Sequence, residues 1–256
     1  MKNLENRFKT RLKAGEQQIG IWNSLQGNAT AEVLATCGFD WMLIDTEHSA
    51  MDVIDVLPAL QSAAAYPDCA AVVRPASNDP VLIKRLLDLG AQTLLIPYVQ
   101  SVAEAEAAVS AMSYPPKGIR GVAGLTRASR FGTIDNYATE AEKELCLLVQ
   151  VETRASLDAL EHIASVDGVD GVFIGPADLA ASLGHPGNPN HPEVVAAIEG
   201  AFARLKKIGV PAGILTLNRD FARRCIEIGT TFTAVGVDLG LLIDAANDLS
   251  KEFAQN

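Results

Sequence analysis

The sequence predicts one α/β domain, residues 1–256, folded as a TIM (β/α)₈ barrel. Its 256 residues match the length of about 250 residues that is typical of such a barrel. Eight short apolar runs alternate with stretches of helical periodicity, the order expected of β-then-α units around a parallel sheet. An open doubly wound sheet is the second candidate, although no Gly-x-Gly-x-x-Gly motif follows the first predicted strand.

The predicted strands are nearly continuously apolar, as expected when helices cover both faces of a parallel sheet. They are Gln18–Trp22, Trp41–Asp45, Ala70–Arg74, Thr93–Pro97, Cys146–Glu152, Gly171–Ile174, Pro211–Leu215 and Phe232–Val235. The predicted helices are Ala29–Cys37, Val53–Ala65, Pro80–Leu89, Ser101–Met112, Ser156–Ala164, Pro192–Ile208, Arg219–Ile228 and Leu241–Phe253. Pro80 and Pro192 suit the first turn of a helix, and Gly38, Gly90 and Gly209 stand where helices usually stop.

The last helix and the long connections are the parts that extend beyond a minimal barrel. One face of the last helix is apolar, with a 3.6-residue period, at Leu242, Ala245, Ala246, Leu249 and Phe253. The two longest connections are Tyr114–Glu142 and Ala180–His191. Loops of this length in a compact barrel are more often functional, or part of an interface, than idle.

Composition and charge exclude several classes of partner. The formal charge of −10 argues against binding to nucleic acid, whose phosphates require a basic surface. No apolar run approaches the roughly 18 residues of a membrane span, and Met1–Gly15 lacks the apolar stretch of a signal peptide. A cytoplasmic location is therefore expected. The cysteines form no paired motif and are expected to be small buried hydrophobic residues, at Cys37, Cys69, Cys146 and Cys225.

Active sites of TIM barrels lie at the carboxyl ends of the strands, where this sequence places several polar residues. Glu152 and Asp178 follow neighbouring strands and should converge. Two carboxylates with room for waters suit a divalent cation such as Mg²⁺, Mn²⁺ or Co²⁺. The structural alternative is that each carboxylate caps a helix or pairs with an arginine. The residues from Gly175 to Asp178 also open a short helix, whose free N–H groups suit the carboxylate of an oxo acid. The alternative there is an ordinary strand-to-helix turn.

Two further strand ends carry an arginine and a histidine. Arg74 ends an apolar strand, and a buried guanidinium needs a partner, which Asp45 or Glu47 would supply. In a catalytic role Arg74 would stabilise the negative oxygen of an enolate. His48 lies three residues after Asp45, so a hydrogen bond between the two side chains would orient the ring and raise its basicity. A purely structural histidine is the alternative.

Other catalytic classes find less support in the sequence. His162 is expected on the surface, and turn formation accounts for His185 and His191. No lysine falls at a strand end, which argues against a Schiff-base aldolase. Neither a Gly-x-Ser-x-Gly motif nor a P-loop is present, so serine and nucleotide hydrolysis are not indicated.

Taken together, these residues resemble the class II pyruvate-dependent aldolases, typified by 4-hydroxy-2-oxoheptanedioate aldolase and its relative 2-dehydro-3-deoxyglucarate aldolase. The resemblance covers nearly the whole chain, and the run from Gly175 to Leu179 is its most specific part. The matching segments are Gly38–Trp41, Asp45–His48, Val72–Pro75, Leu86–Gly90, Tyr114–Pro116, Gly118–Gly121, Leu148–Thr153, Gly168–Leu179 and Ala234–Asp238.

The resemblance implies a role for each site residue. Glu152 and Asp178 would bind the divalent metal, Arg74 would hold the enolate, and His48 with Asp45 would form a catalytic dyad. No organic cofactor is implied. The implied substrate-binding residues are Trp22, Arg74, Gln150, Gly175, Pro176, Ala177, Asp178 and Leu215. Members of this family assemble as hexamers in which pairs of subunits exchange their C-terminal helices. Asp88 matches a residue that family members contribute to a neighbouring subunit's active site.

The sequence departs from the family pattern at two places. The family usually has Asp-Gly-Glu-His-Ala-Pro after the second strand, whereas Thr46 replaces the glycine here and Ser49-Ala50 replaces the last pair. The segment Val122–Phe131 is one residue shorter than in the best-known members. Arg127 and Arg130 in that segment would meet a distal carboxylate of the substrate or, equally, stabilise an interface.

The expected reaction is metal-dependent, reversible cleavage of a 4-hydroxy-2-oxo acid to pyruvate and an aldehyde. With 4-hydroxy-2-oxoheptanedioate, an intermediate of aromatic catabolism, the aldehyde would be succinic semialdehyde; with 2-dehydro-3-deoxyglucarate it would be tartronate semialdehyde. An acyl-CoA lyase of the malyl-CoA or citryl-CoA type shares the barrel and the paired acids, but no basic cluster for CoA phosphates is evident. A phosphoenolpyruvate-type mutase and a non-enzymatic sensor or scaffold are weaker alternatives.

Overall fold

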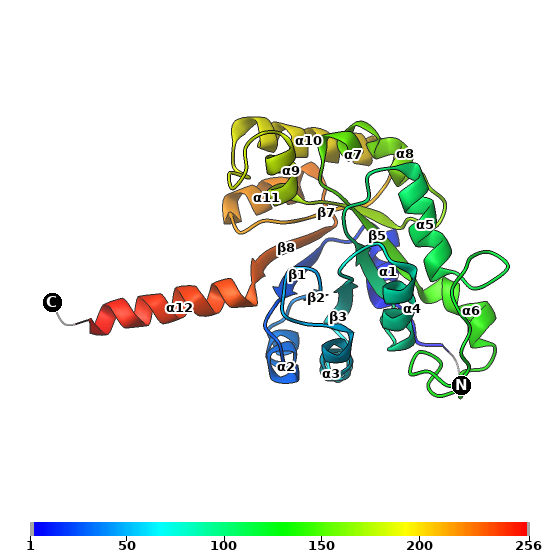
Figure 1. Cartoon of the computed structure of the whole chain (residues 1–256). Coiled ribbons are helices and arrows are strands. Elements are labelled where there is room, and N and C mark those ends of the chain that lie inside the picture. Colours follow the sequence, from blue (N-terminus) through cyan, green and yellow to red (C-terminus); the bar gives the residue numbers. More distant parts are fainter. Residues whose placement is uncertain (1–2, 255–256) are drawn as a thin grey trace.

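The computed structural model describes residues 3–254 as a closed barrel of eight parallel strands, which confirms the predicted fold (Figure 1). Each strand pairs with the next in the sequence, and the last pairs with the first. The strands are β1 (Gln18–Asn23), β2 (Trp41–Asp45), β3 (Ala70–Arg74), β4 (Thr93–Ile96), β5 (Cys146–Val151), β6 (Gly171–Ile174), β7 (Ala212–Leu215) and β8 (Phe232–Val237). All eight predicted strands are present, with ends that differ by at most two residues.

Helices surround the barrel, and three lie outside the eight predicted helix ranges. The helices are α1 (Arg7–Lys13), α2 (Asn28–Thr36), α3 (Val53–Ala63), α4 (Pro80–Asp88), α5 (Val102–Met112), α6 (Tyr137–Glu144), α7 (Arg154–Asp158), α8 (Leu160–Ala164), α9 (Pro176–Ser182), α10 (Pro192–Lys207), α11 (Arg219–Ile228) and α12 (Asp238–Phe253). Neither α1 nor α6 was predicted, whereas α9 is the short helix expected to open at Gly175. The single helix predicted at Ser156–Ala164 is two short helices that meet at Ala159.

Aromatic side chains fill the interior of the barrel. Phe8 from α1 packs edge-on against Trp41 and Phe232, with ring centroids 5.9 and 6.0 Å apart. Trp22 contacts Trp41 and Phe173 at 6.3 and 5.5 Å. All five rings are buried, and edge-to-face contacts of this kind add to the stabilisation that burial alone provides. The unpredicted helix α1 therefore completes the core at the end of the barrel opposite the active-site loops.

Two glycines make room for these rings. A Cβ atom at Gly20 would lie 2.2 Å from the Trp41 ring, and one at Gly213 would lie 2.1 Å from the Phe232 ring. Gly213→Ala should therefore lower the free energy of unfolding by about 1–3 kcal/mol, the usual cost of overpacking a core. Denaturant titration measures this change.

Gly200→Ala provides the matched control. Gly200 lies on α10 with open space around the Cβ position, so the same change should raise the free energy of unfolding by about 0.5–1 kcal/mol. Equal effects of the two substitutions would contradict the packing described here.

The C-terminal helix α12 projects away from the barrel (Figure 1). Its first residue, Asp238, is buried and accepts hydrogen bonds from the Asn23 side chain and from the Ser24 and Leu25 backbone. Beyond this anchor the apolar side chains are exposed: Leu239, Leu241, Leu242, Ile243, Leu249 and Phe253. The exchange of this helix between subunits stays a prediction.

The cysteines differ in their burial. Cys69, Cys146 and Cys225 are buried as predicted, but the prediction for Cys37 was wrong, because it ends α2 on the outer surface. No helix among residues 3–254 has the length and apolar character that crossing a membrane requires.

Candidate active site

Asp45 and Arg74 form a buried ion pair at the carboxyl ends of β2 and β3. These residues are register partners, which places their side chains side by side. Arg74 Nε lies 2.8 Å from Asp45 Oδ1, and Nη2 lies 2.7 Å from Oδ2, a bidentate arrangement. Burial alone would raise the pKa of Asp45, but hydrogen bonding and charge from Arg74 hold it below the ordinary value. Trp22 lies under the pair, with the Arg74 guanidinium carbon 5.2 Å from its ring centroid.

Glu47 is the second acid that faces Arg74. Its Oε2 atom lies 3.0 Å from Arg74 Nη1 and 3.9 Å from His48 Nε2. Among the described residues this buried oxygen has no aligned hydrogen-bond donor. Burial raises the pKa of Glu47 above its ordinary value despite the nearby guanidinium. A buried oxygen of this kind is suited to a water or a bound ligand.

The predicted hydrogen bond between the Asp45 carboxylate and the His48 ring is not among the contacts of residues 3–254. Asp45 Oδ1 instead accepts from the backbone N–H groups of Glu47 and His48, at 3.0 and 3.4 Å. The turn that makes these bonds leaves the His48 side chain 66% exposed. Asp45 therefore orients Arg74, and Glu47 is the carboxylate nearest the His48 ring.

Glu152 lies directly after β5, in a buried position between two donors. Its Oε1 atom accepts from the Tyr98 backbone N–H at 2.9 Å, and its Oε2 atom accepts from the Gln150 amide. The Gln150 side-chain amide oxygen, Oε1, accepts from Arg74 Nη1 at 3.5 Å, so the Gln150 side chain connects Glu152 to the arginine. Tyr98 has a left-handed backbone, φ 53°, a conformation that is uncommon for a residue other than glycine and frequent at functional sites.

The pKa of Glu152 is raised by burial, and the charges of two other carboxylates, Asp178 and Glu47, contribute to the shift. Burial, together with the smaller effect of the Asp178 and Glu47 charges, raises this pKa to about 7, against the hydrogen bonds from Gln150 and Tyr98 that lower it. In the absence of a cation, the free energy of unfolding should therefore decrease as the pH rises from 4.5, the ordinary pKa of Glu152, to about 7. Over this range the unfolded state has released the Glu152 proton, whereas the folded state still holds it. A strongly perturbed carboxyl of this kind is typical of a functional site.

Gly175 and α9 complete the acidic site. A Cβ atom at Gly175 would lie 2.3 Å from Glu152 Oε2, so any larger residue at this position would displace the carboxylate. Pro176 and Ala177 open α9, and Asp178 lies in its first turn on the exposed side. The oxygen donors of Glu152, Asp178 and Glu47 fit a divalent cation, because carboxylates are the ligands that Mg²⁺ and Mn²⁺ prefer.

The remaining predicted residues have other partners in the structure. Leu215 ends β7 and packs, half-buried, against the aromatic core that contains Trp22. Asp88 on α4 pairs with Arg120 of its own chain, Oδ1 to Nη2 2.8 Å. Arg127 donates to the Leu89 carbonyl oxygen at 2.8 Å. Within the described chain, Asp88 and Arg127 therefore have partners near the end of α4.

Sequence reasoning missed Tyr98 and underrated Glu47. Tyr98 acts through its backbone, so its residue type carried no signal. Glu47 was considered only as a structural partner of Arg74, yet its position between that arginine and His48 follows from the turn after β2.

Comparison with known proteins identifies the family. A family model described as HpcH/HpaI aldolase/citrate lyase matches residues 18–245. The chain belongs to that family. Among the relatives of this HpcH/HpaI chain, a pyruvate aldolase of Rhizobium etli is 64% identical over 97% of the chain and 98% of the relative. A hydroxypyruvate/pyruvate aldolase of Sagittula stellata is 59% identical over 94% and 95%, respectively.

Two further comparisons extend the agreement. A 4-hydroxy-2-oxo-heptane-1,7-dioate aldolase of Klebsiella pneumoniae is 53% identical over 99% of this chain and 96% of the relative. A solved structure of an HpcH/HpaI family protein from Burkholderia cenocepacia has a TM-score of 0.93 and 40% identity, over 96% of this chain and 98% of that one. The resemblance predicted from the sequence is confirmed, and the chain is a carbon–carbon lyase of the aldolase type.

Proposed function

We propose that this aldolase catalyses the divalent-metal-dependent, reversible cleavage of 4-hydroxy-2-oxo acids to pyruvate and an aldehyde. The observation that carries the proposal is the buried Glu152 carboxylate, which Gln150 links to the Arg74 guanidinium, with Asp178 and Glu47 near enough for their charges to raise its pKa. An acidic group for a cation and a fixed positive charge for an oxyanion are what this reaction needs. The acyl-CoA alternative is not favoured, because relatives at 53–64% identity are aldolases.

In this proposal Glu152 and Asp178 hold the metal, which is Mg²⁺, Mn²⁺ or Co²⁺. When bound, such an ion polarises the 2-oxo group as a Lewis acid. His48, exposed at the mouth of the site, removes the proton from the C4 hydroxyl group. The C3–C4 bond then breaks, and its electron pair forms the enolate of pyruvate as the aldehyde leaves.

Arg74 would stabilise the negative oxygen of this enolate. Asp45 holds the guanidinium plane through two hydrogen bonds, so the charge is fixed in place before the reaction starts. A proton returned to C3 completes pyruvate. We further propose that Gln150, Trp22, Leu215 and the start of α9 line the substrate-binding site, and that Glu47 is the acid that influences the His48 ring within its own subunit.

The names of the relatives suggest the substrates to test. Pyruvate and hydroxypyruvate appear as the oxo acid in two of them, and 4-hydroxy-2-oxo-heptane-1,7-dioate appears in a third. We propose succinic semialdehyde as the aldehyde to try first and tartronate semialdehyde as the second, with the enzyme working in the cytoplasm. Mass measurement of the products formed from pyruvate and a panel of aldehydes would rank these substrates.

The proposed activity has a direct test that needs no aldehyde. Enzyme with a bound divalent metal should exchange the methyl protons of pyruvate with D₂O, because the enolate forms and is reprotonated at C3. Proton NMR follows the loss of the methyl signal. EDTA should abolish the exchange, and Mn²⁺ or Mg²⁺ should restore it; undiminished exchange in EDTA would contradict the proposal.

We also propose that the enzyme is a homo-hexamer in which pairs of subunits exchange α12. This is supported by the six large apolar side chains that α12 leaves exposed, because a large exposed apolar patch often marks a protein–protein interface. Asp88 of one subunit would then lie near the active site of another. Ending the chain after Asp238 should convert the assembly to smaller species in analytical ultracentrifugation. A truncated chain that sediments like the full-length enzyme would disprove the exchange.

A further inference from the structure

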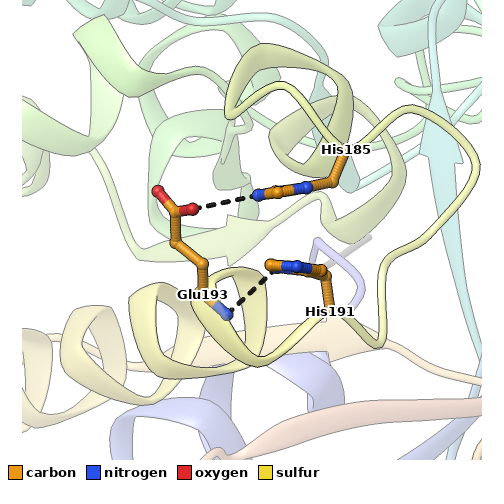
Figure 2. A group of neighbouring side chains, drawn as sticks. All are labelled: His185, His191 and Glu193. Carbon is orange, nitrogen blue, oxygen red and sulfur yellow. Dashed lines mark hydrogen bonds and ion pairs between the residues drawn. The ribbon is translucent and has the colours of Figure 1, made fainter.

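A cluster of side chains that could hold a metal ion lies outside the acidic site, where the loop after α9 meets the start of α10 (Figure 2). His185, His191 and Glu193 each offer one ligand atom, and these atoms all lie within 4.8 Å of one another. The two imidazole rings are stacked, with centroids 3.5 Å apart and planes 16° from parallel. We propose that this cluster, the histidine-loop site, binds a divalent transition-metal ion such as Zn²⁺.

The ligand types distinguish this site from the acidic one. Two imidazoles and one carboxylate suit Zn²⁺, Ni²⁺ or Cu²⁺, whereas an all-oxygen site suits Mg²⁺ and Mn²⁺. Zinc bonds of about 2.0–2.1 Å in a tetrahedron place the ligand atoms about 3.3 Å apart. His185 Nε2 and Glu193 Oε2 are 2.9 Å apart and need to separate only slightly to admit the ion.

His191 is the ligand that must move. Its Nδ1 atom accepts the Glu193 backbone N–H at 3.3 Å and so caps the start of α10. Coordination through either ring nitrogen ends this bond, because a ring that ligates through Nε2 carries its proton on Nδ1. The bond is long, and the ring must also turn, since the lone pairs of two parallel rings do not point at one ion. Gly184 and Gly187, both with positive φ, flank His185 and form the turn that brings it to His191.

The surroundings of the site would neutralise only part of the positive charge of the ion. Glu193 supplies the negative charge, and the start of α10, a positive helix end, opposes a cation. Arg154 lies 3.5 Å from Glu193 Oε1 and leaves Oε2 for the ion. Because Arg154 is 59% exposed, solvent weakens its repulsion of that ion. The contact of His185 Nε2 with Glu193 Oε2 and the hydrogen bond from Glu193 N–H to His191 Nδ1 explain the position of each histidine separately. Neither of them requires the two rings to stack on each other.

Zinc stoichiometry tests the proposal. We expect the parent enzyme to bind one more equivalent of Zn²⁺ than His185→Ala or Glu193→Gln, measured by competition with a chromophoric chelator. His162→Ala is the matched control, because His162 is exposed on α8 away from this loop, and it should bind as the parent does. Glu152→Gln should lose the other equivalent only, so failure of the proposed catalytic site is distinguishable from failure of this one.

A measurement on the parent enzyme removes the dependence on the folding of the variants. Nitrogen-15 NMR of the imidazole rings should show Zn²⁺ shifting the signals of His185 and His191 but not those of His162. Equal zinc stoichiometry in the parent and the His185→Ala protein, or ring signals at 185 and 191 that do not move with Zn²⁺, would overturn the proposal.

Discussion

Glu152→Gln should lose metal binding and catalysis together. The substitution keeps the size of the side chain but removes the buried charge that the proposed metal needs, and the amide presents an N–H₂ group where the carboxylate accepts from Tyr98 or Gln150. A bound metal supplies several kcal/mol of transition-state stabilisation, so kcat/KM should fall by about 10²–10³-fold. Metal affinity should fall by more than the roughly 10- to 100-fold lost when a residue that only orients a ligand is replaced. Isothermal titration with Mn²⁺ and the D₂O exchange assay measure the two effects.

Glu161→Gln is the matched control for this change. Glu161 on α8 pairs with Arg204 near the surface, where removal of one charge of an ion pair changes stability only slightly. Its kcat/KM and Mn²⁺ affinity should equal those of the parent. If Glu152→Gln retained both metal binding and pyruvate exchange, the acidic site would not be the catalytic centre.

Arg74→Lys should bind the metal normally but turn over slowly. Lysine keeps the positive charge but cannot reproduce the two parallel hydrogen bonds to Asp45, so the charge is no longer fixed above Trp22. Removal of one donor to a developing oxyanion costs about 10²–10³ in kcat, and a displaced donor should approach that loss. Lysine is preferred to alanine here, because alanine would leave the buried Asp45 and Glu47 carboxylates unpaired, at about 3–5 kcal/mol of stability.

Steady-state kinetics with a saturating metal separates this effect from misfolding. Arg223→Lys on α11, where the arginine is exposed and pairs with Asp220, should leave kcat unchanged. An Arg74→Lys enzyme with the parent's kcat would exclude an oxyanion role for Arg74. A parallel loss of Mn²⁺ affinity would show instead that Arg74 supports the metal site.

The barrel was predictable because each strand is nearly continuously apolar, a pattern that fits burial on both faces. The helices α1 and α6 were not, since α1 has seven residues with only Phe8 and Leu12 buried, and α6 buries only Ala141. Segments this short have too few buried positions for a period to be evident.

The acidic site was predictable in its members but not in its pairings. Strand order alone brings Glu152 towards Asp178, because β5 and β6 are neighbours. The partner of Asp45 depends on the register between β2 and β3, which places Arg74 directly opposite. The Asp45 carboxylate therefore pairs with Arg74. The expected side-chain bond to His48 rested on sequence spacing, which gives no information on the direction in which a turn points a ring.

The location of Trp22 has an optical consequence. The chain has two tryptophans, and Trp22 lies directly beneath the Arg74 guanidinium, whereas Trp41 lies deeper, 6.3 Å away between ring centroids. A Trp41→Phe enzyme would therefore emit ultraviolet fluorescence from a single indole that borders the reaction centre. The fluorescence intensity of Trp22 would change when an oxyanion binds to the neighbouring Arg74 guanidinium. This variant would therefore report occupancy of the active site without an added dye.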